Sequence, residues 1–293
     1  MNWLKSLKGK VKRKEPLKGH TSYRIGGKAR FFIEPKDAED LRIVVRQARR
    51  SGLTLFILGA GSNVLAADRG VAGVVVKLNS PFFKKVSFSG NRCQVGSALT
   101  LGALVQAAKK HALSGTEFLC GIPGTVGGAL VMNAGAWGKS ISGCVQEVTV
   151  MDKIGRVKVL KRNNIDFAYR RSSLGEYIVL AAQLRLKKSD IKSIEGRIKK
   201  FLAQRHKNQD NTSPNAGCVF KNPPNDSAGR LIDRCGLKGR RIGGAVISSR
   251  HANFILNDSH AKAADVLALM RLAKKEVKNK FRVSLEPEIR IWD

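Results

Sequence analysis

Acidic residues are scarce in this chain. Its 293 residues include 22 Asp and Glu against 54 Lys and Arg, which gives a formal net charge of +32. Such a charge attracts nucleic acids, anionic membranes or polyphosphate ligands. The basic residues are dispersed and do not form one stripe, so a uniformly solvated basic surface stays open as an equal alternative to a charged partner.

Cysteines are few and widely spaced, at Cys93, Cys120, Cys144, Cys218 and Cys235. They form no CxxC pair and have no His pair nearby, which argues against a zinc site and against a disulfide scaffold. An odd number of free cysteines fits a reducing cytosol. We therefore expect a cytoplasmic protein without a metal.

Long apolar runs are also missing. No stretch approaches the ~20 apolar residues that span a bilayer, and the basic N-terminus lacks the apolar part of a secretory signal. Trp3, Leu4, Leu7 and Val11 recur at helical spacing. They predict a short basic helix within residues 1–19 that packs on the body of the protein, with a helix on a membrane surface as the alternative.

Helical and strand periodicities both occur, and the length suits about two domains. The pattern predicts an α+β fold with one domain over residues 20–188 and a smaller one over residues 189–293. Helices are expected at residues 37–51, 101–111, 190–209, 227–235 and 261–280. Strands are expected at residues 22–35 (broken by a turn), 53–58, 71–78, 92–95, 145–152, 156–161, 177–186, 218–220, 245–247, 253–256 and 285–291.

Two glycine-rich segments stand out, FILGAGSNVL at residues 56–65 and GIPGTVGGA at residues 121–129, the second followed closely by NAGAWG at residues 133–138. Glycine lets backbone N–H groups turn toward an anion and lets a ligand approach the chain closely. Together they predict one bulky, doubly phosphorylated nucleotide cofactor. The first loop is not a Rossmann fingerprint, because Val64 stands where the third glycine belongs and no long helix follows.

Three polar clusters lie outside these loops, at residues 167–173, 216–223 and 285–290. The first pairs two arginines with hydroxyls, the second sets a thiol, an ammonium and an amide on one extended segment, and the third places two carboxylates on one strand face. Taken singly, each fits a surface turn or a salt-bridged edge strand as well as a site.

Together, in this order along the chain, these motifs resemble those of the UDP-N-acetylenolpyruvoylglucosamine reductases, flavoenzymes of peptidoglycan synthesis. The resemblance spans residues 15–293. It is carried by TSYRIGG (21–27), LGAGSN (58–63), GIPGTVGG (121–128), NAG (133–135), YRRS (169–172), GCVFKNP (217–223), AGRLID (228–233), GLKG (236–239), HANF (251–254) and LEPE (285–288).

The resemblance implies non-covalent FAD in an N-terminal domain of the vanillyl-alcohol-oxidase type, NADPH as hydride donor, and a C-terminal domain that binds the enolpyruvyl sugar nucleotide. The implied product is UDP-N-acetylmuramate. Small molecules are then the partners, with no specific nucleic acid, and a monomer or weak dimer is expected. The implied FAD-binding residues are Gly59, Ala60, Gly61, Ser62, Asn63, Gly121, Ile122, Pro123, Gly124, Thr125, Gly127, Gly128, Asn133, Ala134 and Gly135.

By the same resemblance, Arg170 and Glu288 stabilise an enolate-like charge and Cys218 donates the proton. Most members have serine where this chain has Cys218, and a thiol is a reasonable acid near neutral pH. The implied substrate-binding residues are Tyr169, Lys221 and Asn222. No tyrosine follows Tyr177, so the chain resembles the shorter class of the family, which lacks a tyrosine loop over the substrate, and residues 207–215 are a candidate lid.

Two alternatives remain at this point. A different flavin oxidase or dehydrogenase of the same fold would not need the clusters at Cys218 and Glu288. A basic nucleic-acid-binding protein would fit the charge, but the sequence contains no basic recognition helix, zinc finger or aromatic RNA-binding strand.

Overall fold

The fold is described from a computed structural model, which covers residues 2–210 and 212–293. By packing, the chain forms two units, each built from several stretches of sequence. Unit 1 comprises residues 2–13, 31–60 and 72–204; unit 2 comprises residues 14–30, 61–71, 205–210 and 212–293. The predicted domain boundary at residue 189 stays a prediction. The packing units do not correspond to it directly, because each unit contains several separate stretches of the chain.

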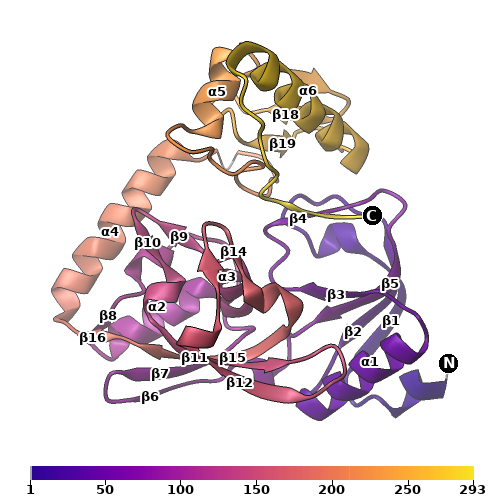
Figure 1. Ribbon diagram of the computed structural model, residues 1–293, viewed down its shortest axis with the longest axis vertical. Helices are drawn as coiled ribbons and strands as arrows, with labels where there is room; N and C mark the ends of the chain where they lie inside the picture. Colours follow the sequence, from indigo (N-terminus) through magenta and orange to yellow (C-terminus); the bar gives the residue numbers. More distant parts are fainter. Residues whose placement is uncertain (1, 211) are drawn as a thin grey trace. The chain divides into compact units, whose positions relative to one another are not determined.

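Unit 1 contains most of a four-stranded sheet of order β1-β2-β5-β3 (Figure 1). Its strands are β1 (Lys10–Pro16), β2 (Lys28–Glu34), β3 (Leu55–Leu58) and β5 (Val71–Lys77), with β3 and β5 parallel. Helix α1 (Ala38–Arg50) begins where the Asp37 side chain accepts a hydrogen bond from the backbone N–H of Asp40 at 2.9 Å. Its apolar face, which includes Leu41 and Val44, is fully buried in the core.

The second sheet of unit 1 has the order β12-β11-β15-β7-β6 and is antiparallel throughout. Its strands are β6 (Val86–Ser89), β7 (Arg92–Gly96), β11 (Val145–Met151), β12 (Val157–Lys161) and β15 (Ile178–Arg185). Helices α2 (Leu101–Lys110) and α3 (Val126–Val131) share its buried core. Short paired strands complete the unit: β8 (Leu113–Ser114) with β16 (Lys187–Lys188), β9 (Gly135–Ala136) with β10 (Lys139–Ser140), and β13 (Phe167–Ala168) with β14 (Arg171–Ser172).

Helix α4 (Ile191–Asn208) leads from unit 1 into unit 2, the boundary falling after Gln204. Unit 2 holds helices α5 (Ala228–Arg234) and α6 (Ala263–Phe281) and the antiparallel strands β17 (Arg241–Ile242), β18 (Ala245–Ile247) and β19 (Ile255–Asn257). Strand β4 (Val64–Ala66) pairs in parallel with β20 (Arg290–Trp292). The core of unit 2 therefore includes Tyr23, Ile25 and Leu65 from the early part of the chain.

The predicted helix within residues 1–19 is confirmed only in part: Trp3, Leu4, Leu7 and Val11 pack on the core as expected, but most of the segment is not helical. The structure has a short 3₁₀ helix at Asn2–Ser6 and then strand β1. The backbone N–H groups of Lys8 and Gly9 donate to the Asp40 carboxylate at 3.0 and 2.8 Å. These tertiary hydrogen bonds replace the ones that a continuing helix would have formed.

Two predicted strands are also shorter than expected. Residues 21–24 form a turn, in which Arg24 has φ +54° and donates its N–H to the Thr21 carbonyl. Near the C-terminus, residues 285–289 make only an isolated bridge at Pro287, and the strand begins at Arg290. Proline has no backbone N–H to give to a continuous ladder.

Candidate functional site

The two glycine-rich loops meet within unit 1. A Cβ added at Gly59 would lie 2.8 Å from Thr125 Oγ1, so the first loop packs directly on the second. Thr125 is the N-cap of α3 and its hydroxyl accepts from the N–H of Gly128 at 3.4 Å. A Cβ added at Gly128 would meet only that hydroxyl, at 3.6 Å, so its outer side is open to a ligand. A close loop contact beside an open glycine is the arrangement that a bulky phosphorylated cofactor needs.

The first loop is divided between the two units, because Gly59 and Ala60 belong to unit 1 and Gly61, Ser62 and Asn63 to unit 2. In unit 2, Gly61 has φ +72°, and a Cβ there would lie 2.0 Å from the His20 carbonyl oxygen. Only glycine fits this position.

The structure joins Asn63 to the third polar cluster. Its side-chain amide donates to the backbone carbonyl of Glu288 at 3.1 Å, and its own carbonyl accepts from the N–H of Arg290 at 2.9 Å. A predicted cofactor residue and a predicted catalytic residue are therefore held side by side in unit 2.

The second loop region holds the arginine cluster in place. Asn133 is buried with φ +43°, and its amide donates to the Ala168 carbonyl at 3.0 Å. The Ser172 hydroxyl donates to the carbonyls of Leu130 and Val131, at the end of α3. Both ends of the β13–β14 hairpin are thus tied to the segment that carries Asn133, Ala134 and Gly135.

Arg170 occupies the tip of this hairpin. Its Nη1 donates to the Gly135 carbonyl at 3.0 Å, and its guanidinium carbon lies 5.2 Å from the centre of the Tyr169 ring, which is 53% exposed. The backbone of Arg170 has φ +56°, in the left-handed region that non-glycine residues rarely adopt. Such conformations cluster at functional sites, where the surrounding structure holds them.

In unit 2, Cys218 and Glu288 lie on two adjacent extended segments. The Glu288 N–H donates to the Val219 carbonyl at 2.8 Å, and Phe220 forms an isolated antiparallel β-bridge with Pro287. This register places Glu288 opposite Val219, one residue from Cys218. The Cys218 side chain is half-buried against Val246, Phe254 and Leu256.

The segment that carries Cys218 is fixed from its other side by Asn253, a residue that the prediction missed. The Asn253 side chain accepts from the Phe220 N–H at 3.0 Å and donates to the Phe220 carbonyl at 2.8 Å. Its backbone carbonyl accepts from the Val219 N–H at 2.9 Å. The only sequence signal for this role was the HANF motif, since an asparagine that pairs with a distant strand has no local pattern.

Two of the predicted substrate-binding residues make structural contacts. Lys221 Nζ lies 3.1 Å from a carboxylate oxygen of Glu286. The Asn222 side-chain oxygen accepts from the N–H of Ala228 at 3.1 Å, at the start of α5. Neither contact uses every donor of its side chain, so the substrate role stays a prediction.

The stretch that was a candidate lid, residues 207–215, is anchored through Asp210. This carboxylate is 4% exposed and accepts hydrogen bonds from the hydroxyls of Ser248 and Thr212. Burial raises the pKa of Asp210, but these hydrogen bonds outweigh it and hold the pKa below its usual range. Asn211 lies outside the described residues, and a lid role for the rest of the stretch stays a prediction.

Comparisons with known proteins agree along the chain. A family model described as "FAD binding domain" matches residues 29–161, and one described as "UDP-N-acetylenolpyruvoylglucosamine reductase, C-terminal domain" matches residues 208–292. UDP-N-acetylenolpyruvoylglucosamine reductase 2 of Symbiobacterium thermophilum is 43% identical over 97% of this chain and 92% of its own length. The reductase of Moorella thermoacetica is 42% identical over 98% of this chain and 94% of its own.

Among solved structures, the UDP-N-acetylenolpyruvylglucosamine reductase from Thermus caldophilus matches with a TM-score of 0.83 at 35% identity, over 98% of this chain and 100% of that chain. No helix among the described residues is both long and apolar enough to span a bilayer. The matches confirm the predicted fold class, an FAD-binding domain followed by a smaller substrate-binding α+β domain, and FAD as the cofactor. The chain therefore belongs to the family of UDP-N-acetylenolpyruvoylglucosamine reductases, the FAD-dependent oxidoreductases of peptidoglycan precursor synthesis.

Proposed function

We propose that this chain reduces enolpyruvyl-UDP-N-acetylglucosamine to UDP-N-acetylmuramate with electrons from NADPH, and that Arg170, Cys218 and Glu288 are its catalytic residues. The observation that carries the assignment is the double attachment of Glu288. Its carbonyl accepts from Asn63 of the first glycine loop, and its N–H donates to Val219 beside Cys218. One residue thus fixes the spacing between the loop expected to hold FAD and the thiol expected to donate a proton.

The glycine loops are suited to FAD, with Gly59, Gly61 and Gly128 letting the chain and the ligand approach closely. FAD held there would supply hydride transfer from NADPH to the terminal enolpyruvyl carbon. Side chains of the protein must then stabilise the negative charge that this transfer creates on the substrate and supply the proton that completes the reduction.

Arg170 is assigned to the charge on the substrate carboxylate. A guanidinium pairs with a carboxylate through two parallel N–H bonds, and the hydrogen bond from its Nη1 to Gly135 orients it before substrate arrives. Orientation in advance is what makes such groups effective, because no reorganisation is needed during the reaction. Glu288 assists as a neutral donor or through a bridging water.

Cys218 is assigned as the acid. Its S–H bond breaks as a C–H bond forms at the carbon bearing the ether oxygen, which leaves a thiolate that takes a proton back from water. An ordinary thiol has a pKa of about 8.5, so most of it is protonated near neutral pH.

The experiment that tests these roles separates the two half-reactions by stopped-flow absorbance of the flavin. Cys218→Ala should leave flavin reduction by NADPH unchanged and slow reoxidation by the enolpyruvyl sugar nucleotide by ~10²-fold or more. Cys218→Ser should recover part of the lost rate of reoxidation, because a hydroxyl of similar size can also donate a proton. The recovery should be incomplete, because a hydroxyl is a weaker acid than a thiol. Equal losses in both half-reactions would show that Cys218 has only a structural role.

We further infer a cytoplasmic monomer or weak dimer whose partners are its small-molecule substrates, without sequence-specific nucleic-acid recognition. Five free cysteines support a reducing compartment. Sedimentation velocity over a range of protein concentrations tests the oligomeric state.

A further inference from the structure

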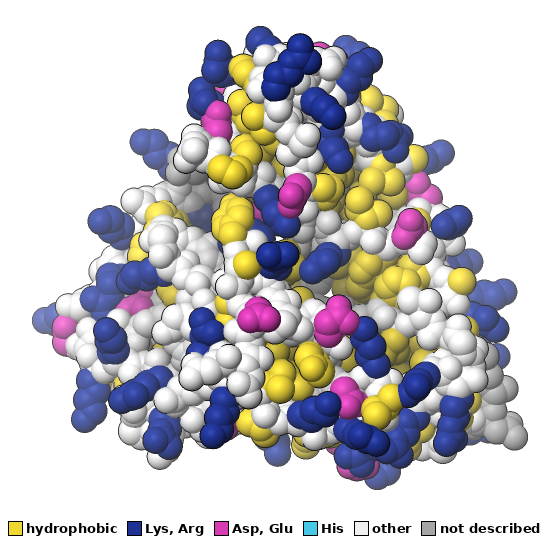
Figure 2. All heavy atoms as spheres, viewed as in Figure 1, with side chains coloured by type: hydrophobic (Ala, Val, Ile, Leu, Met, Phe, Trp, Pro, Cys, Tyr) yellow, Lys and Arg dark blue, Asp and Glu magenta, His cyan; other side chains and the backbone are white. Residues whose placement is uncertain are grey.

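The reductase function leaves most of the +32 charge unexplained. Figure 2 shows Lys and Arg side chains spread over the face it draws, with few Asp or Glu among them. On α6 of unit 2 the basic residues are not dispersed. Arg271, Lys274, Lys275 and Lys278 follow one another at spacings of three, one and three residues, and Arg282 follows directly after the helix. The spacings of the first four place their side chains on one helix face.

This basic stripe (Arg271, Lys274, Lys275, Lys278 and Arg282) is exposed along its whole length. None of the five side chains forms an ion pair with another described residue. From Arg271 to Lys278 the stripe rises roughly 10 Å along α6, and Arg282 lies just beyond the end of the helix at Phe281. Five uncompensated cations in a row repel one another, and a chain of anions with a similar repeat would relieve that repulsion.

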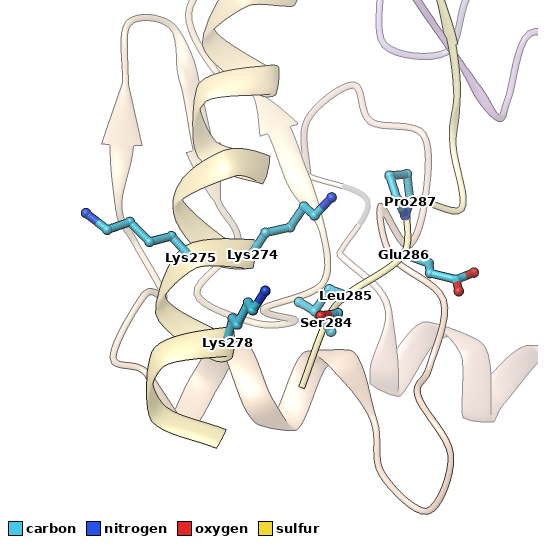
Figure 3. Close-up of a pocket in the computed structure, with 7 residues that line it drawn as sticks. All are labelled: Lys274, Lys275, Lys278, Ser284, Leu285, Glu286 and Pro287. Atoms are coloured by element: carbon cyan, nitrogen blue, oxygen red, sulfur yellow. The ribbon is translucent and has the colours of Figure 1, made fainter. Parts of the chain in front are cut away.

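A groove of about 490 Å³ runs beside the stripe, between α6 and residues 284–287. Figure 3 shows Lys274 and Lys278 projecting toward that segment, whereas Lys275 points away from it. The one acid among the residues that line the groove, Glu286, is paired with Lys221. The groove is therefore positive along one wall and neutralised along the other.

We propose that the basic stripe and its groove bind the phosphodiester backbone of a nucleic acid without reading its sequence. A groove favours a linear chain over a flat surface. None of the exposed large hydrophobic residues described lies on α6, so the face lacks the apolar anchor of a membrane-surface helix. The groove is lined by no aromatic ring on which a base could stack. Charge alone is left as the means of recognition.

The proposal makes a quantitative statement about salt. Neutralising five phosphates of a single strand gives a slope of about −3.5 for log K against log salt concentration, from roughly −0.7 per phosphate. Affinity should then fall about 10²-fold between about 50 and 200 mM salt. The probe is a fluorescein-labelled oligothymidylate, and the readout is its anisotropy with the full-length holoprotein.

The test compares two triple variants of equal charge. Lys274→Gln, Lys275→Gln and Lys278→Gln together should weaken binding and reduce the slope to about −1.4, because two cations remain. The control, Lys110→Gln, Lys161→Gln and Lys192→Gln, removes three exposed charges from α2, β12 and α4 of unit 1. It should keep the wild-type slope. Both triple variants should retain reductase activity, which reports that they are folded.

Three results would overturn the proposal. Equal loss in both triple variants would show that attraction depends on net charge and not on α6. Absence of oligothymidylate binding to the wild-type protein would exclude the site. Binding to vesicles of phosphatidylglycerol and phosphatidylcholine, but not to the oligonucleotide, would assign the stripe to a membrane.

Discussion

The Asn253 side chain replaces a neighbouring strand for Phe220, accepting from its N–H at 3.0 Å and donating to its carbonyl at 2.8 Å. Asn253 is 1% exposed, so both backbone groups of Phe220 depend on this one amide. Because Phe220 lies two residues from Cys218, the amide sets where the thiol lies along its segment.

We expect Asn253→Ala to leave the N–H and the carbonyl of Phe220 without partners. The free energy of unfolding should fall by roughly 3 kcal/mol, and the Tm by roughly 10 °C. Differential scanning fluorimetry measures the shift, and stopped-flow should show a larger loss in flavin reoxidation than in flavin reduction. The matched control is Asn279→Ala at an exposed position of α6, which should be nearly neutral. A stable Asn253→Ala variant with normal half-reactions would contradict the role.

The contact between Gly59 and Thr125 predicts a coupling between the two glycine loops. Gly59→Ala should push the loops apart, because the new Cβ would lie 2.8 Å from Thr125 Oγ1, and FAD affinity should fall about tenfold. Removing that oxygen with Thr125→Ala should make Gly59→Ala far less harmful. A double-mutant cycle of FAD dissociation constants measures the coupling. Additive effects would mean that the loops do not act on FAD together.

Arg170→Lys should keep the positive charge but lose the planar pair of donors, so we expect flavin reoxidation by substrate to slow about 10²-fold. Flavin reduction by NADPH should change little. The neighbouring Arg171→Lys, an exposed position on β14, is the control and should behave as wild type. Single-turnover absorbance of the flavin measures both rates. Equal effects at the two arginines would count against the assignment.

The buried carboxylate of Glu117 predicts a pH dependence of stability in unit 1. Burial raises the pKa of Glu117, but hydrogen bonds from the backbone, Ser114 and Arg197 outweigh burial and leave the pKa below its usual range. Since the unfolded state then binds the proton more readily, this stabilisation is complete above the ordinary pKa of about 4.3 and is lost as the pH falls below it.

Glu117→Gln should therefore destabilise unit 1 by roughly 2 kcal/mol at neutral pH and flatten the loss on acidification. Urea unfolding at a series of pH values measures both effects. Glu39→Gln removes a carboxylate that is 67% exposed and serves as the control, with the wild-type profile expected. An unchanged slope in Glu117→Gln would assign the acid sensitivity to other groups.

Local signals predicted the local structure well. The predicted helices began at Asp37 and Ser227, which are the N-cap residues of α1 and α5 in the structure. The predicted bounds of β18 match the observed ones. The glycine content located both loops. The N-terminal strand was missed because its conformation depends on Asp40, a partner 31 residues away from Gly9, and no local pattern encodes such a contact.

The site was predictable in composition but not in geometry. Motif resemblance supplied Arg170, Cys218 and Glu288. Arg170 donates to the Gly135 carbonyl and Glu288 accepts from the Asn63 amide, and both partners lie on loops distant in sequence, so these hydrogen bonds depend on packing. The contribution of Leu65 to the core of unit 2 was not predicted either, because most of its packing partners there are distant in sequence.

That interleaving has a consequence for how the chain folds during synthesis. Tyr23, Ile25 and Leu65 are made early, yet their packing partners in unit 2 begin at residue 205. At a synthesis rate of about 5–20 residues per second, roughly 10 s or more pass between the synthesis of these apolar side chains and that of their packing partners. All the residues of unit 1 are therefore made before unit 2 can be completed, and residues 14–30 and 61–71 find their partners only when residues beyond 205 have been made.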